Sequence, residues 1–244
     1  MTGAHDSAGV PFGGRELTGT GFDGDTGAAD ETLLTALAAD TVTPADERSL
    51  MRAVAEARLL VPIVAEPAEV DQSGTLAVEK RTDMAAVTLV APDGARALPV
   101  FSSMTALAAW DPSARPVPVT AARAAQAAVS ERCDVMVLDV AGPRTMALRP
   151  SMVWALAQQR EWVPAHEDET VRRAVELAVR DQHGVLAHSV GPGAAGEGVL
   201  QVSLTLAPGL DQSTVRHIAT AIGERLATDG EIRARIDGLA FSIS

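Results

Sequence analysis

Hydrophobic positions recur at helical spacing in some segments of the chain and form short apolar runs in others. The helical spacing predicts helices over 31–39, 44–58, 103–110, 121–132 and 152–158. The apolar runs predict strands over 59–65, 84–90, 95–101 and 135–138. Because helices and strands alternate, this part of the chain is predicted to be an α/β domain with a mixed sheet.

Prolines and short polar motifs refine this picture. Pro62 cannot donate to a ladder, so the strand over 59–65 is expected at an edge or a bulge. The apolar run 135–138 is short enough to be a strand buried on both faces. Pro92-Asp93-Gly94 favours a tight turn, which predicts a β-hairpin between its two flanking strands. Gly142-Pro143 then turns the chain into the segment 145–148.

Polar residues also mark where helices begin. Thr43 stands before an N1 proline, and Thr120 precedes the Ala-rich helix, so each is expected to cap a helix. Ser102 or Ser103 is expected to cap the helix over 103–110.

The pattern changes after Trp162-Val163-Pro164-Ala165, which is predicted to be a hinge. A helix with an acidic start at 167–169 is followed by strands over 184–190 and 199–206. A helix capped by Asp211 or Ser213 and a last strand over 238–243 complete this part. The α-β-β-α-β order predicts a smaller α+β domain, an antiparallel sheet with helices on one face.

The N-terminal residues 1–30 differ from the rest in composition. They hold 8 of the 20 glycines, five acidic residues and one basic residue. Such a segment has too few large apolar groups to offset the cost of ordering its backbone. The chain is therefore divided into a disordered acidic tail (1–30), an α/β domain (31–163) and a C-terminal α+β domain (166–244).

The net charge and the cysteine content indicate which partners and which cellular compartment are expected. The formal net charge is −12, and no basic stripe interrupts it, so nucleic acid is not expected as a partner. No apolar run reaches the about 18 residues of a membrane span, and no secretory leader is recognisable. The single cysteine fits a reducing compartment, so a cytoplasmic location is expected.

Two motifs that suggest cofactors or metals have a simpler explanation. Gly191-Pro192-Gly193-Ala194-Ala195-Gly196 matches the spacing of a dinucleotide fingerprint, but a strand and not a helix follows it, so a hairpin loop is the better interpretation. The five histidines form no i, i+4 pair and have no partner cysteines. No cofactor and no metal ion is therefore expected.

Two nucleophiles remain as candidates. Cys133 is expected at the C-terminal end of a helix, where the dipole disfavours a thiolate, and a packed free thiol is the alternative. Ser102 and Ser103 lie where a strand meets a helix, but the glycines of a nucleophile elbow are absent and helix capping explains them.

Several motifs in order resemble the N-terminal domain of the SseB family. They are Leu59-Leu60-Val61-Pro62, Leu98-Pro99-Val100-Phe101-Ser102-Ser103 with Trp110 after it, Pro116-Val117-Pro118-Val119, and Val137-Leu138-Asp139-Val140-Ala141-Gly142-Pro143. The similarity covers about residues 33–160, and the C-terminal part is similar to the second domain of many members. Ser102 replaces the usual threonine, and Asp139 an asparagine. The resemblance implies the fold but no catalytic residues, because the activity of the family is not established.

The sequence therefore predicts a non-enzymatic binding or regulatory protein with a protein partner. The expected interaction surface lies at one end of the sheet and comprises Phe101, Ser102, Ser103, Trp110, Gly142 and Pro143. One alternative is an enzyme of amino-acid or sulfur metabolism that uses Cys133. Another is a small-molecule sensor, which needs a concave apolar pocket lined by a few polar groups.

Overall fold

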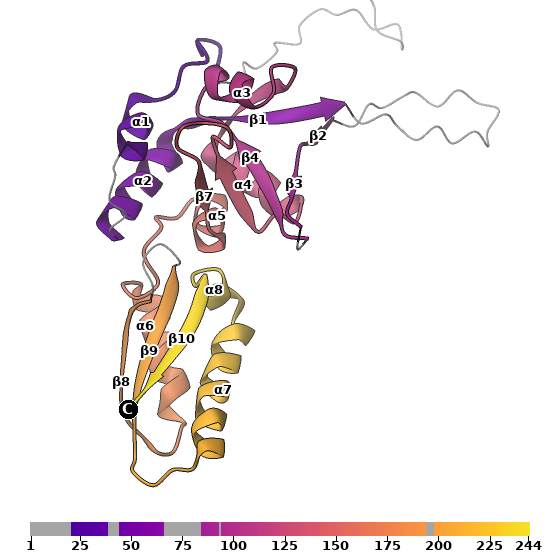
Figure 1. The fold of residues 1–244 in the computed structure, drawn as a ribbon. Coiled ribbons are helices and arrows are strands. Elements are labelled where there is room, and N and C mark those ends of the chain that lie inside the picture. The colour runs from indigo at the N-terminus through magenta and orange to yellow at the C-terminus, as the bar shows by residue number, and fades with distance from the viewer. Residues whose placement is uncertain (1–20, 39–43, 66–83, 93, 194–197) are drawn as a thin grey trace, which may run out of the picture.

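The computed structural model describes residues 21–38, 44–65, 84–92, 94–193 and 198–244 (Figure 1). The first part contains α1 (Glu31–Leu37), α2 (Pro44–Glu56), β1 (Arg58–Ala65), β2 (Met84–Ala86), β3 (Leu89–Val90), β4 (Arg96–Val100), α3 (Met104–Trp110), β5 (Arg115–Thr120), α4 (Ala121–Ser130), β6 (Val135–Leu138), β7 (Met146–Leu148) and α5 (Pro150–Ala157). The second part contains α6 (Glu169–Arg180), β8 (Val185–Pro192), β9 (Val199–Leu206), α7 (Gln212–Thr228), α8 (Gly230–Arg233) and β10 (Gly238–Ile243). The predicted α/β to α+β fold class is confirmed.

Two sheets form the first part, which we call the N-terminal unit (21–162). One has the strand order β2-β1-β5 and is antiparallel, and the other has the order β3-β4-β6-β7. In the second sheet β4 and β6 are parallel, because α3, β5 and α4 carry the chain across between them. A bridge between Leu60 and Phe101 joins the two sheets.

The expectation that Pro62 marks an edge strand is wrong. β1 lies in the middle of its sheet and pairs with both β2 and β5. Pro116 of β5 stands opposite Pro62 in the register. The missing N–H of each proline therefore costs no hydrogen bond between these two strands. The Pro62 carbonyl accepts from Val87 N on the β2 side, just beyond the last paired residue of β2. The missing N–H therefore falls where the partner of β1 changes from β2 to Phe101.

The core of the N-terminal unit lies between α2, α4 and α5 and the strands. Leu59, Leu98, Met136, Leu138 and Met152 are all fully buried in it. Val135 and Val137 are only half-buried, so the prediction that β6 is covered on both faces is wrong. The predicted helix starts are confirmed at three positions. Ser103, Thr120 and Asp211 accept the capping hydrogen bonds of α3, α4 and α7. Thr43 and Asp93 lie outside the described residues.

The prediction that the whole segment 1–30 is a disordered tail does not hold for residues 21–30. Residues 1–20 lie outside the described part of the chain, but residues 21–30 are held against β1 and α3 of the N-terminal unit. Arg58 forms an ion pair with Asp25 at 2.8 Å and also donates to the Ala28 carbonyl. Gly27 accepts from Met104 N, and Asp30 caps α1. Polar anchoring through Arg58 thus orders a glycine-rich segment that buries little apolar surface.

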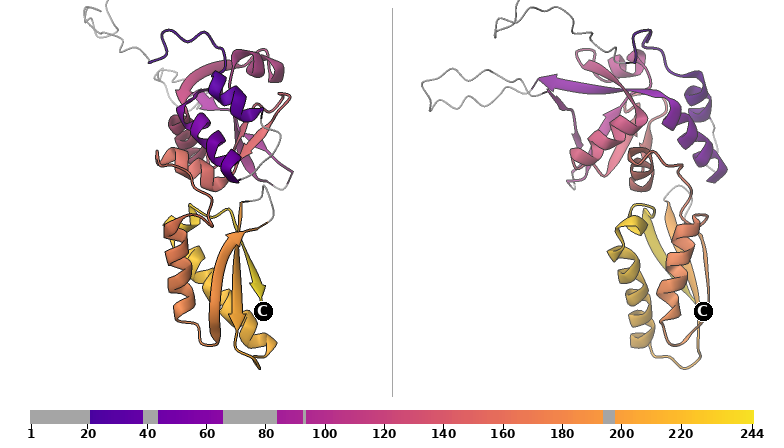
Figure 2. Two further views of the ribbon diagram at one scale, coloured as in Figure 1. Left: turned by 90° about the vertical axis from the view of Figure 1, so that its left-hand side faces the viewer. Right: turned by 180° about the vertical axis from the view of Figure 1, so that it is seen from behind.

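The second part, which we call the C-terminal unit (168–244), is a sheet of order β10-β9-β8 with α6 and α7 on one face (Figure 2). Its core contains Val171, Val175, Leu200, Val202 and Ile222 and is separate from that of the N-terminal unit. The predicted antiparallel sheet is wrong for β10, which runs parallel to β9. The reason is that α7 and α8 carry the chain back to the start of β9 before β10 begins.

Candidate functional site

The parallel strands β4 and β6 end side by side, and a buried hydrogen-bonded pair lies just beyond them. Asp139 Oδ1 accepts from Ser102 N at 2.8 Å, and Oδ2 accepts from Ser102 Oγ at 2.7 Å. Asp139 has a positive φ of 53°, which asparagine and aspartate tolerate better than most residues. The carbonyl of Asp139 accepts from Gly142 N, so the turn at Gly142 is built on the same residue.

The six residues of the predicted surface differ in how far they are exposed to solvent. Phe101 and Ser102 are 0% and 2% exposed, so their side chains support the sheet end from beneath. Ser103 caps α3, and Trp110 is half-buried with its ring centroid 5.3 Å from that of Phe101. Gly142 is half-buried and Pro143 is exposed on the neighbouring turn. A substitution of Phe101 would consequently test folding and not the surface.

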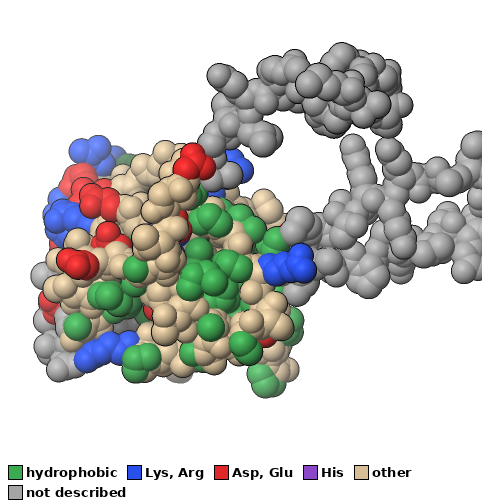
Figure 3. Space-filling model, turned by 90° about the horizontal axis from the view of Figure 1, so that it is seen from above, with side chains coloured by type: hydrophobic (Ala, Val, Ile, Leu, Met, Phe, Trp, Pro, Cys, Tyr) green, Lys and Arg blue, Asp and Glu red, His purple; other side chains and the backbone are tan. Residues whose placement is uncertain are grey.

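The solvent-facing side of α3 is what this end of the sheet exposes. Met104 is 43% exposed, and Ala108 and Ala109 are exposed beside the half-buried Trp110. Seen from the end of the molecule that carries α3, hydrophobic side chains gather near the middle of the face, with charged side chains toward one side (Figure 3). At this end of the sheet, the exposed apolar side chains that surround the predicted residues therefore belong to the outer side of α3.

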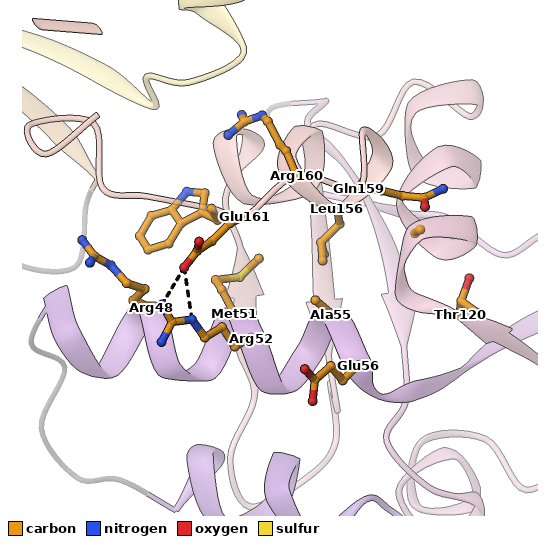
Figure 4. A pocket seen from close by; sticks show the side chains of 12 residues that line it. Arg48, Met51, Arg52, Ala55, Glu56, Thr120, Leu156, Gln159, Arg160 and Glu161 are labelled. Carbon is orange, nitrogen blue, oxygen red and sulfur yellow. Dashed lines mark hydrogen bonds and ion pairs between the residues drawn. The ribbon is translucent and has the colours of Figure 1, made fainter. Parts of the chain in front are cut away.

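A groove lies at a different place, along α2 where the end of α5 and the start of α4 meet it. Its volume is about 790 Å³, within the range of small-molecule sites. Met51, Leu156 and Trp162, each at most 5% exposed, form its apolar floor. Charged and polar side chains stand around them (Figure 4): Arg48, Arg52, Glu56, Thr120, Gln159, Arg160 and Glu161.

Ion pairs organise the rim of the groove. Arg52 donates to Glu161 at 2.6 Å, and this hydrogen bond, followed by the charge of Arg52, lowers the pKa of Glu161. Arg48 pairs with Glu167, which follows the segment 162–165. Arg160 donates to the Gln158 side chain and to the Ala234 carbonyl of the C-terminal unit. Burial and then the charge of Arg235 lower the pKa of Arg160.

A buried polar network connects the two units. Arg149 donates to Glu47 at 2.7 Å and to Asp237 at 3.0 Å, and these three side chains are 14%, 11% and 6% exposed. Burial alone would lower the pKa of Arg149, but the two carboxylates outweigh it and raise that pKa. Asp237 also accepts from Ser151 N and Oγ. Ser151 Oγ in turn accepts from the indole N–H of Trp162, over whose ring Arg149 lies.

The first part of the chain matches a known protein family. The family model described as SseB protein N-terminal domain matches residues 31–155. The chain belongs to the SseB family. No curated protein and no solved structure matches it. The match covers α1 to α5 almost to its end, so α2 of the groove and the whole sheet end lie within the SseB domain.

Sequence reasoning missed the groove and the Arg149 network of this SseB-family chain. The groove residues come from α2, from the start of α4 and from 156–162, and no local motif links these segments. Arg149 and its partners Glu47 and Asp237 are separated by 102 and 88 residues. One signal was present: Arg149 stands directly before the N1 proline of α5, and a guanidinium has no acceptor with which to cap that helix.

Cys133 of the SseB domain follows α4 and is 5% exposed. Burial raises its pKa, as do the charges of Glu131 and Asp134, while Arg96 lowers it. Its raised pKa disfavours the nucleophilic thiolate. Within the described residues, no group of three or more His, Cys, Asp and Glu side chains could hold a metal ion. None of the helices described is long and apolar enough to cross a membrane.

Iodoacetamide should alkylate Cys133 slowly in the native protein at pH 7 and rapidly in denaturant. The stabilisation that burial gives the thiol form is fully present below the unfolded pKa and is lost as the pH rises through the folded pKa. Native alkylation should therefore accelerate only above the pH at which an unfolded control accelerates. Mass spectrometry of time points gives both rates. Native alkylation as fast as in denaturant would support the thiol enzyme instead.

Proposed function

We propose that this SseB-family protein is a binding protein that holds a small organic molecule in the groove along α2. The observation that carries the proposal is the combination of an apolar floor and a polar rim in one concavity of about 790 Å³. Such a site favours a ligand with an apolar body and at least one charged or hydrogen-bonding group. Guanidinium groups and carboxylates on the rim offer partners for either charge.

The position of the groove suggests how binding could be regulatory. Trp162 forms part of the groove floor and also donates to Ser151, which hydrogen-bonds Asp237 of the C-terminal unit. Arg160 lines the groove and donates to the Ala234 carbonyl. A ligand that shifts Trp162 or Arg160 would alter the contacts between the two units. In this proposal the groove is the sensor and the arrangement of the units is the output.

The proposal includes the division of the chain into domains over 31–163 and 166–244. Separate hydrophobic cores support the division, and residues 159–162 at the end of the first domain line the groove. We also propose a cytoplasmic location and no nucleic-acid partner. Both rest on the charge and composition of the chain.

Filling the groove should abolish binding without unfolding the protein. Ala55 is exposed and lines the groove, so Ala55→Trp places a ring in the space for the ligand. A thermal-shift panel of amino acids and organic acids, serine included, should yield a compound that adds about 2.7 kcal/mol of stability at 100 times its Kd. Ala55→Trp should remove this gain.

The matched control places the same ring on the other candidate surface. Ala108 is exposed on α3, and Ala108→Trp should leave the thermal shift unchanged. If Ala108→Trp removes the shift and Ala55→Trp does not, the ligand binds at the α3 face. A panel without any stabilising compound counts against the groove as a ligand site.

Docking of a protein partner on α3 is the second candidate function. It is favoured by the exposed apolar side chain of Met104 and by Trp110, which is half-buried at the other end of the same helix. In that case Met104→Asp should weaken the complex and leave the thermal stability of the free protein unchanged.

A further inference from the structure

The edge strands of the three sheets differ in how well they are protected from pairing with another chain. Exposed edges are usually short, interrupted by proline or a bulge, or charged. β2, β3 and β7 have three, two and three residues. β5 contains Pro116 and Pro118 and begins with Arg115. β8 has a bulge between Val185 and Ala187 and ends at Pro192.

β10 has none of these protections. It has six residues, Gly238 to Ile243, without proline, bulge or charged side chain. It forms the outer edge of its sheet (Figure 2). Among the strands that the structure describes, it is the one long edge left without a device against strand addition.

The backbone groups that face outward from β10 follow from its ladder. Ser244 N donates to the Leu204 carbonyl, and the Ser244 carbonyl accepts from Leu206 N, so both groups of Ser244 point to β9. Because successive residues alternate, Ala240 and Ser242 also face β9. The N–H and C=O groups of Leu239, Phe241 and Ile243 point to the free edge. No described residue outside the ladder hydrogen-bonds these groups.

The core beneath α7 is incomplete on the same side. Leu200, Val202 and Leu204 of β9 are at most 1% exposed, whereas Leu239 and Phe241 of β10 are only half-buried. α7 lies directly over β10, since a Cβ at Gly223 would be 3.9 Å from both side chains. Ile243 is 43% exposed. An apolar side chain beside β10 would therefore extend the core of the C-terminal unit into a place that α7 already covers.

The widths of the two layers indicate which partner fits. Two helices side by side cover about 20 Å, while three strands span only about 14 Å. One added strand brings the sheet to about 19 Å and leaves the helices as its cover. A second copy of the chain would bring its own α7 into the same space. The layer geometry thus favours an extended peptide segment over a self-paired dimer.

We propose that the free edge of β10 binds an extended segment of a partner protein as a fourth strand. The segment would place apolar side chains toward α7 at alternate positions and small or polar ones on the open face, with no charge in the paired stretch. Hydrogen bonds to Leu239, Phe241 and Ile243 would hold its backbone. This site is independent of the groove and of the α3 face.

Hydrogen exchange of the full chain, measured by NMR, tests both the edge and the partner. The amides of Leu239, Phe241 and Ile243 should exchange rapidly in the free protein, and those of Ala240 and Ser242 slowly. The probe is a capped peptide in which valine and threonine alternate between terminal lysines. On its addition the three rapid amides should become protected. Protection of these amides in the free, dilute protein, or no protection with the peptide, would overturn the proposal.

Two matched pairs of variants locate the peptide. Ile243→Pro removes one outward N–H and should weaken peptide binding about three- to tenfold relative to Ile243→Thr, which keeps it. Ser242→Lys places a charge on the β10 edge and should also weaken binding, whereas Ser189→Lys on β8 should not. Equal binding by both members of each pair contradicts the proposed edge. Protection that rises with protein concentration without peptide would assign the edge to a second copy.

Discussion

Replacing Arg149 with methionine should lower the free energy of unfolding by about 3–5 kcal/mol. The change removes the cation from a buried network and leaves the carboxylates of Glu47 and Asp237 without their shared partner. It also removes the guanidinium that lies over the Trp162 ring. Because Glu47 and Asp237 belong to different units, the loss should appear in the unfolding of both. Urea titration followed by circular dichroism measures the effect.

Arg216→Met is the control for this substitution. Arg216 is exposed on α7, so the same chemical change there should alter the stability by less than about 0.5 kcal/mol. A loss for Arg149→Met as small as that of an exposed ion pair, below about 1 kcal/mol, would mean that the network does not stabilise the contact between the units.

Replacing Asp139 with alanine should cost about 2–4 kcal/mol. The carboxylate is the acceptor for the backbone N–H and the hydroxyl of Ser102, which is 2% exposed, so both donors would be left buried without a partner. Alanine also tolerates the positive φ at this position less well than aspartate. The same urea titration gives the difference between the variant and the parent protein.

Asp139→Asn separates these two causes. Asparagine tolerates the positive φ and keeps one acceptor oxygen, so it should cost only about 1 kcal/mol. If the alanine variant is as stable as the asparagine variant, the hydrogen bonds to Ser102 and the backbone conformation do not stabilise the end of the sheet.

Helix positions could be predicted because the signals for helices are local. Ser103, Thr120 and Asp211 each accept from the N–H three residues further on, and a sequence displays such pairs directly. The hairpin between β3 and β4 was likewise encoded in its turn. Local chemistry therefore explains why most elements lie close to their predicted ranges.

Strand partners could not be predicted because they depend on distant segments. Pro62 reads as an edge signal, yet Pro116 on the neighbouring strand removes the conflict. β10 reads as one more antiparallel strand, but its direction depends on how far α7 and α8 carry the chain. Neither fact is visible in the strand itself.

Of the residues predicted to form an interaction surface, Phe101 and Ser102 are buried and cannot contact a partner. The motif around Phe101 and Ser102 does mark the sheet end, where these residues are buried and α3 covers them. Asp139 was noticed only as a departure from the family pattern, although it is the acceptor that fixes Ser102. The residue type alone does not show whether a side chain is buried and supports the fold or is exposed and can contact a partner.

Fragment screening by NMR on the labelled full chain tests whether the groove along α2 is the ligand site. Only three tryptophans are present, so their indole N–H signals separate the candidate surfaces. We expect bound fragments to shift the Trp162 indole signal and the amides of 48–56 and 159–162 and to leave the Trp110 signal in place. Fragments that shift Trp110 and the amides of α3 while Trp162 stays unchanged would contradict it.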